Sequence, residues 1–474
     1  MEYQKDCAQI SAHALIFPYP SQGHINPMLQ FAKQLTTYGV RCTLATTRFT
    51  LSSTKPDPGP VHIAAISDGC DSSGFVEAGS IPVYLDRLVS FGSKTLKELL
   101  QSESSMGRPV DVLIYDSFCP WAAGVARVLR IATVAFFTQP CFVNSIYEYL
   151  WKNQIPLPIQ HDLVKFPVSA ELAPHELPSY VLGSGPKQGY AGMLLDQFKE
   201  LDNADSILIN SFHELEPQEA DYMARTWDAK TIGPCIPTSY LDRRLDSDTK
   251  YGFHLFNPAT SCMAWLDSKA TNSVVYVSFG SMTSLTPIQM ENIARGIYNA
   301  GKPFLWVVRS DEASKIPKGF IEMSKERGII VPWASQLEIL QHRAVGCFLT
   351  HCGWNSTLEA ISLGVPMVAM PQSTDQPTNA KYIEAVWKVG LRVKAGEEGL
   401  VSAQEIERCV TEVLEGERCH EFQSNARKLS TSAKEAMGET ASSTKNLVEF
   451  VRKFARPKKI ENEVSAEIRT DLIV

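Results

Sequence analysis

Short apolar runs alternate with longer amphipathic stretches through the first half of the chain. Apolar residues at helical spacing predict helices over 25–39, 80–101, 118–130 and 187–201. The remaining apolar runs are short and nearly unbroken, and they predict strands over 13–20, 41–47, 61–67, 110–118, 132–138 and 206–212. Strands that are apolar on both faces suit a parallel sheet with helices on either side.

Residues 235–258 interrupt this rhythm because they are polar, contain Pro and carry charges of both signs, which is typical of a linker between domains. The rhythm then resumes with a helix over 287–300, helical sequence over 417–455, and apolar runs that predict strands over 273–281, 303–309, 328–333, 345–350, 366–370 and 390–393. We therefore expect two doubly wound α/β domains, over 1–234 and 259–455, followed by a tail over 456–474. We expect the last helix to pack back on the first domain.

The composition fits a globular protein. Of the 474 residues, 44% are hydrophobic and 20% are charged. A net charge of −7 without a basic stripe argues against a nucleic-acid partner. No apolar run approaches the roughly 18 residues of a membrane span, and the N-terminus lacks the features of a secretory signal.

The cysteines and histidines show no ligand or disulfide spacing. Eleven cysteines occur without a CxxC pair, which favours reduced thiols and a cytoplasmic location. The ten histidines form no HxxxH or Cys/His arrangement, so we expect no metal. We also expect a monomer.

The segment from 333 to 376 carries polar and aromatic residues at turns between predicted strands and helices, and this set suits a nucleotide-sugar. Trp333 offers a face for a flat base, and Gln336 and Glu359 can hydrogen-bond a ribose. The other polar residues can meet a diphosphate or sugar hydroxyls: His351, Asn355, Ser356, Asp375 and Gln376.

Two glycine-containing loops follow predicted strands in the second half. One runs through Gly280 towards a helix after Pro287, and the other runs through Gly353 into a helix that begins near Asn355. Free backbone N–H groups and a positive dipole end at each helix start can hold a pyrophosphate without a metal. The glycines allow the backbone to approach the ligand closely.

His24 lies just after the first predicted strand, and Asp116 lies at the end of the strand predicted over 110–118. Residues at the carboxyl ends of neighbouring parallel strands meet at one edge of a sheet, so these two side chains can converge across 92 positions of sequence. A carboxylate on one imidazole nitrogen fixes the tautomer and leaves the other nitrogen to accept a proton. Taken alone, each residue is more often structural, as a hydrogen-bonding His or a capping Asp.

The 333–376 segment resembles the C-terminal signature box of plant family-one UDP-dependent glycosyltransferases. The matching motifs are W-A-x-Q from 333, HCGWNS from 351, Glu359, GVP from 364 and DQ from 375. The resemblance extends from PSQGHINPMLQFAK at 20–33 to the last predicted strand. Ser335 stands where the family usually has Pro, which should cost loop rigidity and no ligand contact. The resemblance implies a GT-B fold, in which two Rossmann-like domains face each other across a cleft.

The resemblance also assigns roles in binding the sugar donor. It implies that Trp333 stacks on uracil, that Ala334 contacts the base through its backbone, and that Gln336 and Glu359 take the ribose hydroxyls. Four residues are implied for the phosphates: Ser281, His351, Asn355 and Ser356. Four are implied for the sugar: Trp354, Asp375, Gln376 and, from the other domain, Thr138. A Gln at the end of the box is associated with glucose, so we expect UDP-glucose as the donor and no cofactor.

In the same way, the resemblance makes His24 the general base and Asp116 its charge-relay partner. The expected reaction is a direct inverting displacement, in which an acceptor hydroxyl attacks the anomeric carbon opposite UDP. Carboxylate acceptors are already ionised and should depend on His24 much less. The Asp246-Ser247-Asp248 sequence matches the metal-binding motif of other glycosyltransferases, but it lies in the linker without a preceding apolar strand, so we do not expect it to function.

The acceptor pocket of this family is built from variable loops of the N-terminal half. Candidate loops here span 68–81, 118–121, 142–149 and 177–190. The aromatic residues expected in it are Phe17, Tyr19, Phe118, Trp121 and Phe142. We therefore expect a small lipophilic acceptor: a phenolic, a steroid, a triterpenoid or an aromatic acid.

Two other functions would suit parts of this sequence. A nicotinamide-dependent oxidoreductase would need a GxGxxG motif after the first strand, and neither half has one. A non-catalytic protein that binds nucleotide-sugars would keep the 333–376 segment but would have no reason to keep His24 and Asp116.

Overall fold

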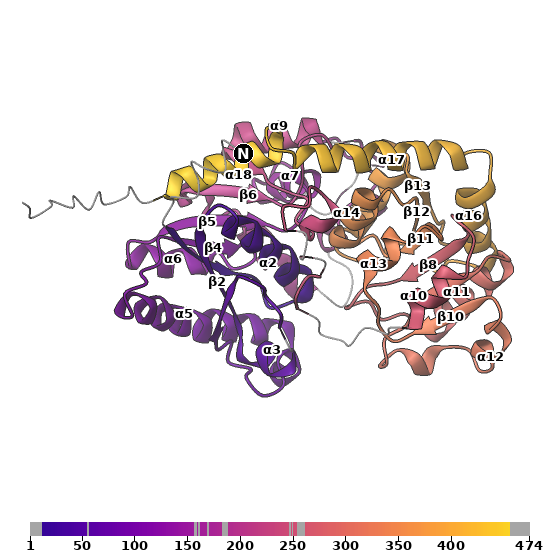
Figure 1. Ribbon diagram of the computed structural model, residues 1–474, viewed down its shortest axis with the longest axis horizontal. Coiled ribbons are helices and arrows are strands. Elements are labelled where there is room, and N and C mark those ends of the chain that lie inside the picture. The colour runs from indigo at the N-terminus through magenta and orange to yellow at the C-terminus, as the bar shows by residue number, and fades with distance from the viewer. Residues whose placement is uncertain are drawn as a thin grey trace, which may run out of the picture.

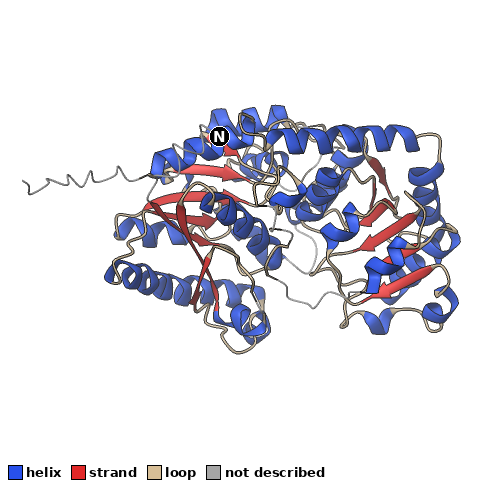
Figure 2. Cartoon of the chain, in the orientation of Figure 1, coloured by secondary structure: helices blue, strands red, loops and turns tan. Residues whose placement is uncertain are grey.

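The computed structural model describes residues 12–54, 56–155, 159, 162–167, 170–182, 188–245, 248, 250–253 and 261–455. They form two lobes, each built on one parallel sheet that is covered by helices on both faces (Figures 1 and 2). The tail expected over 456–474 lies outside the described residues.

The N-terminal lobe contains a seven-stranded parallel sheet with the order β3-β2-β1-β4-β5-β6-β7. Its strands are β1 (Ala12–Phe17), β2 (Val40–Thr47), β3 (His62–Ile66), β4 (Val112–Asp116), β5 (Ala132–Phe137), β6 (Ser206–Ile209) and β7 (Ala229–Thr231). Its helices are α2 (Gln22–Thr36), α3 (Arg48–Ser53), α4 (Phe75–Ala78), α5 (Ile81–Ser105), α6 (Trp121–Val128), α7 (Cys141–Trp151), α8 (Ala191–Asp196) and α9 (Pro217–Trp227). Every residue of β1 and β4 is buried, as expected for strands covered on both faces.

The C-terminal lobe contains a six-stranded parallel sheet with the order β10-β9-β8-β11-β12-β13. Its strands are β8 (Val274–Ser278), β9 (Phe304–Val307), β10 (Gly328–Val331), β11 (Val345–Thr350), β12 (Met367–Ala369) and β13 (Gly390–Arg392). Its helices are α10 (Ser261–Asp267), α11 (Pro287–Asn299), α12 (Phe320–Ser324), α13 (Gln336–Gln341), α14 (Trp354–Leu363), α15 (Gln376–Lys381), α16 (Ala403–Glu415) and α17 (Cys419–Ala436). A π-helical turn spans Tyr382–Val386.

The last helix, α18 (Ser442–Phe454), belongs by its packing to the N-terminal lobe. Its buried residues Leu447 and Phe450 share a core with strands β1, β2 and β4. Figure 1 shows α17 and α18 along the same side of the molecule, one over each lobe. The segment from α17 to α18 therefore crosses from one lobe to the other.

Every strand predicted from an apolar run is present, and β7 is a further strand that no apolar run predicted. Two helical predictions differ from the structure. The helix predicted over 187–201 is reduced to α8 with short 3-10 turns on either side, and the helical stretch over 417–455 is divided into α17 and α18.

The segment predicted as a linker is packed against the lobes wherever it is described. Ile236, Tyr240 and Leu241 are buried in a small cluster with Leu337 of α13. Asp248 forms an ion pair with Lys33 of α2 at 2.7 Å, and both side chains are almost fully buried. Asp248 is thus a structural partner of Lys33, while Asp246 and Ser247 lie outside the described residues.

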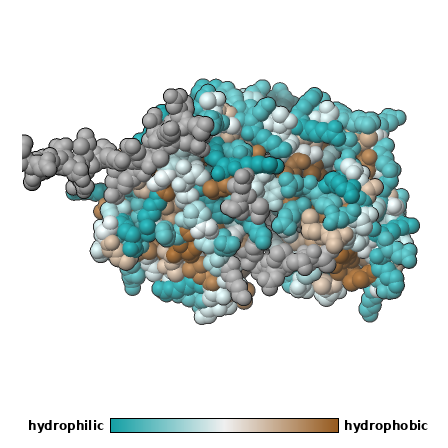
Figure 3. Space-filling model, in the orientation of Figure 1, coloured by the Kyte–Doolittle hydropathy of each residue, from teal (hydrophilic) through white to brown (hydrophobic). Residues whose placement is uncertain are grey.

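None of the helices in the described ranges is both long and apolar enough to cross a bilayer. The face drawn in Figure 3 is largely hydrophilic, with smaller hydrophobic areas between polar side chains.

Candidate active site

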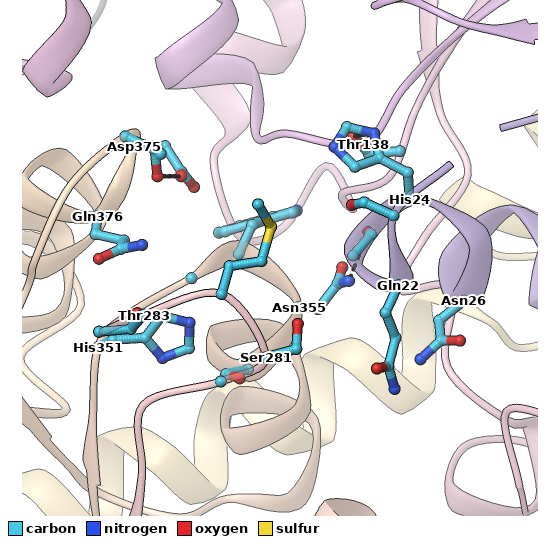
Figure 4. A pocket seen from close by; sticks show the side chains of 18 of the residues that line it. Gln22, His24, Asn26, Thr138, Ser281, Thr283, His351, Asn355, Asp375 and Gln376 are labelled. Atoms are coloured by element: carbon cyan, nitrogen blue, oxygen red, sulfur yellow. Dashed lines mark hydrogen bonds between the residues drawn. The ribbon is translucent and has the colours of Figure 1, made fainter. Parts of the chain in front are cut away.

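A cavity of about 300 Å³ lies between the two lobes. The N-terminal lobe contributes residues from the loop after β1, the start of α2, the end of β5 and the region around α8. The C-terminal lobe contributes the loops after β8, β10, β11 and β12. The cavity is therefore lined by the carboxyl ends of strands from both sheets, where doubly wound folds bind their ligands (Figure 4).

His24 and Asp116 come together at this cavity because β1 and β4 are neighbours in the sheet, with Phe17 paired to Tyr115. His24 Nδ1 lies 2.7 Å from Asp116 Oδ2. The imidazole lines the cavity with 16% of its side chain exposed, whereas the carboxylate is fully buried. Only the ring of this pair can therefore meet a ligand.

Further contacts fix the orientation of this pair. The backbone N–H groups of Tyr19 and Phe118 donate to the two oxygens of Asp116 at 3.2 and 3.0 Å. Thr138 Oγ1 lies 3.1 Å from His24 Nδ1, and the rings of Tyr19 and Phe118 pack against the imidazole. Because Asp116 and Thr138 both face Nδ1, Nε2 is the ring nitrogen left to accept a proton.

On the opposite side of the cavity, His351 is enclosed by two glycines. A Cβ atom at Gly280 would lie 2.7 Å from His351 Nε2, and a Cβ atom at Gly353 would lie 2.6 Å from it. Ser281 and Thr283 line the cavity beside this ring (Figure 4). Only glycine at these two positions leaves room for the imidazole in its observed place.

The two helix starts expected at these loops differ in their relation to the cavity. α14 begins at Trp354, directly after Gly353, so its first turn with Asn355 and Ser356 lines the cavity. α11 begins only at Pro287, after an N-cap at Thr286 that accepts the N–H of Gln289. The cavity lining reaches from Gly280 to Thr283 and stops before this helix. The expectation of a second helix start at the cleft is therefore wrong, because six residues separate Gly280 from α11.

Gln336 and Glu359 form a hydrogen-bonded pair in the lining of the cavity. Gln336 Nε2 donates to Glu359 Oε2 at 2.7 Å and to Ser356 Oγ at 2.8 Å, while Tyr251 Oη donates to Glu359 Oε1 at 2.7 Å. Burial raises the pKa of Glu359 to about 7, although the hydrogen bonds from Tyr251 and Gln336 oppose this rise. This carboxylate therefore changes its charge near neutral pH.

Asp375 and Gln376 lie where α15 begins and are held by short-range contacts. Asp375 accepts hydrogen bonds from Thr374 Oγ1 at 2.6 Å and from Asn379 Nδ2 at 2.7 Å, and burial raises its pKa. The side-chain oxygen of Gln376 accepts the backbone N–H groups of residues 372 and 373, which leaves its NH₂ group for the cavity.

Two residues of the signature box reach across to the N-terminal lobe. Trp354 Nε1 donates to the backbone oxygen of Asn210 at 2.8 Å, and Asn355 Nδ2 donates to the backbone oxygen of Gly23 at 2.7 Å. Gly23 immediately precedes His24, so the second bond joins the box to the loop of the imidazole. Trp333 and Ala334 line the cavity from the loop after β10.

The structure corrects the aromatic residues expected at the acceptor side. Tyr19 and Phe118 line the cavity, but Phe17 and Phe142 are fully buried in the core and do not. Phe142 lies in α7, not in a loop, and its ring stacks on Tyr382 at 3.7 Å. Trp121 also lies away from the cavity, where it packs edge-on against Phe17.

Several lining residues were not singled out from the sequence. Gln22 and Asn26 flank His24 on the first turn of α2 and face the same space (Figure 4). Gln22 and Asn26 share one face of α2 because they are four positions apart, but each lies only two positions from His24, a spacing that does not place helical side chains on one face. Other residues in this group are Gln139, Met193, Leu194, Lys250, Tyr251, Tyr276 and Leu337. Nothing in the local sequence of these residues indicates that they line the cavity, because their place there depends on how the two lobes pack.

No three His, Cys, Asp or Glu residues in the described ranges are grouped so as to hold a metal ion. The cavity offers one imidazole with its carboxylate, a second imidazole and a helix start. It also offers the carboxyl groups of Glu359 and Asp375 and several amide and hydroxyl groups.

Comparison with known proteins agrees with this geometry. Residues 257–455 match the family model described as "UDP-glucoronosyl and UDP-glucosyl transferase". The chain is 46% identical to UDP-glycosyltransferase 79 of Oryza sativa subsp. japonica over 449 aligned residues. The alignment covers 93% of this chain and 96% of that protein. The chain belongs to the UDP-glycosyltransferase family.

A further relative and a solved structure extend the match. Flavonol 7-O-beta-glucosyltransferase UGT74F1 of Arabidopsis thaliana is 45% identical, over 94% of this chain and 99% of that protein. The crystal structure of Os79 from O. sativa in complex with UDP matches with a TM-score of 0.89 and 45% identity, over 93% of this chain and 100% of that one. The predicted family, GT-B fold and enzyme class are thereby confirmed, and the oxidoreductase alternative is excluded.

Proposed function

We propose that this UDP-glycosyltransferase transfers glucose from UDP-glucose to a hydroxyl or carboxylate of a small lipophilic acceptor by direct displacement, with His24 as the general base. The observation that carries the proposal is that His24, oriented by Asp116, lines the same cavity as the signature box. A protein that only bound the nucleotide-sugar would not need this pair.

In this proposal the donor lies along the C-terminal side of the cavity. Uracil stacks on Trp333 with Ala334 beside it, and the ribose hydroxyls bond to Gln336 and Glu359. The phosphates meet the first turn of α14, where free backbone N–H groups favour an anion. Four side chains contribute to the phosphate contacts: Ser281, His351, Asn355 and Ser356.

The glucose then lies towards the other lobe. Asp375 accepts hydrogen bonds from sugar hydroxyls, and the NH₂ group of Gln376 donates one. This division of roles is consistent with the contacts that leave Gln376 as a donor. Trp354 and Thr138 complete the surface around the sugar.

The chemical step moves one proton and one electron pair. Nε2 of His24 takes the proton of the acceptor hydroxyl as its oxygen attacks the anomeric carbon. The bond from that carbon to the β-phosphate oxygen breaks, and its electron pair leaves with UDP. Attack from the face opposite UDP converts an α-linked donor into a β-glucoside, and Asp116 stabilises the imidazolium that forms.

The acceptor side is aromatic and aliphatic, which supports a lipophilic acceptor. Tyr19, Phe118, Tyr180, Tyr190 and Met193 line this part of the cavity. The name of one relative describes a flavonol glucosyltransferase, and a flat phenolic of that kind matches such walls.

The experiment is a transfer assay with UDP-glucose and a panel of phenols, aromatic and fatty acids, and sterols. We expect release of UDP with at least one acceptor class and a β-configured glucoside by NMR of the product. An α-glucoside would contradict direct displacement, and UDP-glucose binding without transfer to any class would contradict the enzymatic assignment for these acceptors. The same panel with UDP-galactose tests the preference for glucose.

A further inference from the structure

Tyr251 lies in the segment between the two sheets, and its backbone is fixed to the N-terminal lobe. Gln30 Nε2 of α2 donates to the backbone oxygens of Lys250 and Tyr251 at 3.3 and 3.2 Å. The next residue, Gly252, accepts the N–H of Asp57 at 2.7 Å. At Gly252, φ is +87° and a Cβ atom would lie 2.3 Å from Asp57 O, so the backbone follows this path only with glycine there.

The side chain of Tyr251 leaves that lobe and enters the cavity. Its hydroxyl donates to Glu359 Oε1 at 2.7 Å, and Glu359 belongs to α14 of the C-terminal lobe. The other oxygen of Glu359 accepts Gln336 Nε2. Tyr251 thus joins the backbone of one lobe to the carboxylate that we assign to the ribose in the other.

We propose that Tyr251 is a positioning residue for the ribose subsite, which orients Glu359 so that the carboxylate can accept the hydroxyls of the donor's ribose. This inference rests on the proposed function of Glu359. A carboxylate has about four lone-pair sites. Tyr251 and Gln336 occupy one on each oxygen, which leaves one on each oxygen for the two ribose hydroxyls.

The burial of Glu359 and the anchoring of Tyr251 favour this role over a purely structural one. Glu359 is only 4% exposed, and a buried carboxylate stays ionised only when donors compensate for its lost hydration. The hydrogen bond from Tyr251 stabilises the ionised form, and an ionised acceptor binds hydroxyl donors more strongly than a neutral one. Because its backbone is held by α2, Tyr251 also makes nucleotide affinity depend on the position of the N-terminal lobe.

Tyr251→Phe tests the inference, because it removes only the hydroxyl. Binding of UDP and of 2′,3′-dideoxy-UDP is measured calorimetrically with the full-length chain. We expect the Kd for UDP to rise about tenfold, because the variant loses one hydrogen bond to a charged group. The Kd for dideoxy-UDP should change by less than about twofold, since that ligand has no ribose hydroxyls for Glu359. With UDP-glucose, KM should rise while kcat stays unchanged.

Two controls sharpen the test. Tyr298→Phe removes a phenolic hydroxyl outside the cavity and should leave both Kd values unchanged. In a Glu359→Gln background, Tyr251→Phe should have little further effect on UDP binding, because the two residues act through one contact.

The other outcomes overturn the inference in distinguishable ways. An equal loss of affinity for both ligands would make Tyr251 a structural residue only. Unchanged UDP binding would remove any role, and tighter binding would mean that Tyr251 occupies the ribose position and is displaced by the donor. If the unsubstituted enzyme bound the two ligands equally, the assignment of Glu359 to the ribose would itself fail, and the inference with it.

Discussion

His24 Nδ1 lies 2.7 Å from Asp116 Oδ2, although the two residues are 92 positions apart along the chain. The contact exists because β1 and β4 are hydrogen-bonded neighbours whose carboxyl ends open on the same cavity. Asp116 also accepts backbone N–H groups on both of its oxygens, so its position is fixed independently of His24.

Asp116→Asn should therefore reduce both activity and stability. An amide has only one acceptor oxygen, so one of the two buried N–H groups loses its partner at a cost of roughly 1–3 kcal/mol in the free energy of unfolding. The imidazole also loses its anionic partner, and kcat with a phenolic acceptor should fall by roughly 10²–10⁴-fold. Steady-state kinetics and urea denaturation check both effects. Full activity in a folded variant would show that the carboxylate does not support His24.

His24→Ala should separate acceptors by their acidity. With a phenol or an alcohol, kcat should fall by at least about 100-fold, because no other group takes the proton. With a carboxylic acid, which is ionised at neutral pH, the loss should be small. The Kd for UDP should be unchanged, and His62→Ala, an exposed histidine on β3, serves as the matched control. Equal losses for phenols and carboxylates would contradict a role in proton transfer.

Gly353→Ala should weaken UDP binding without straining the backbone. φ at Gly353 is −58°, which alanine adopts freely, but the added methyl group would lie 2.6 Å from His351 Nε2 and displace that ring. We expect the Kd for UDP to rise at least about tenfold, because the charge-assisted contact between His351 and the phosphates is lost. Gly124→Ala, where nothing lies within 4 Å of the added atom, is the control. Unchanged UDP affinity would mean that His351 does not contact the phosphates.

Sequence patterns predicted those parts of the molecule that depend on local order. Apolar runs predicted the strands, and strands in a parallel sheet bring their ends together, which is why His24 and Asp116 could be paired from sequence. The loop that follows β11 could be assigned in the same way, because its Gly353 leads directly into α14.

Packing between the lobes could not be predicted. α7 is buried on nearly all sides, so its sequence lacks the polar face by which a helix is recognised, and Phe142 was expected in a loop. The polar composition of 235–258 indicated a linker between domains, but it did not indicate that Asp248 is buried against Lys33 or that Tyr251 reaches Glu359. Each of these contacts joins residues more than 100 positions apart.

Phe142→Ala tests whether this aromatic residue is core or acceptor pocket. Its ring is fully buried and stacks on Tyr382 of the C-terminal lobe. Truncation should lower the free energy of unfolding by roughly 3–5 kcal/mol, the usual cost of removing a buried Phe. Tyr190→Phe is the contrast, since Tyr190 lines the cavity and should alter acceptor KM with little change in stability. A change in acceptor preference without a change in the free energy of unfolding would show that Phe142 belongs to the acceptor pocket.

Glu359 should make nucleoside binding depend on pH near neutrality. Its pKa is raised to about 7 by burial, so the free protein holds a proton there at lower pH, and a neutral carboxyl group accepts ribose hydroxyls less well. Affinity should therefore rise with pH through about 7 and level off above it, with a slope of at most about tenfold per pH unit. Uridine is the suitable ligand, because UDP has a phosphate that titrates in the same range. Histidines and Asp375 also face the cavity, so the Glu359→Gln variant shows which group causes the pH dependence. The affinity of this variant for uridine should be lower and independent of pH from 6 to 8. A pH dependence that the substitution leaves unchanged would assign the titration to another group.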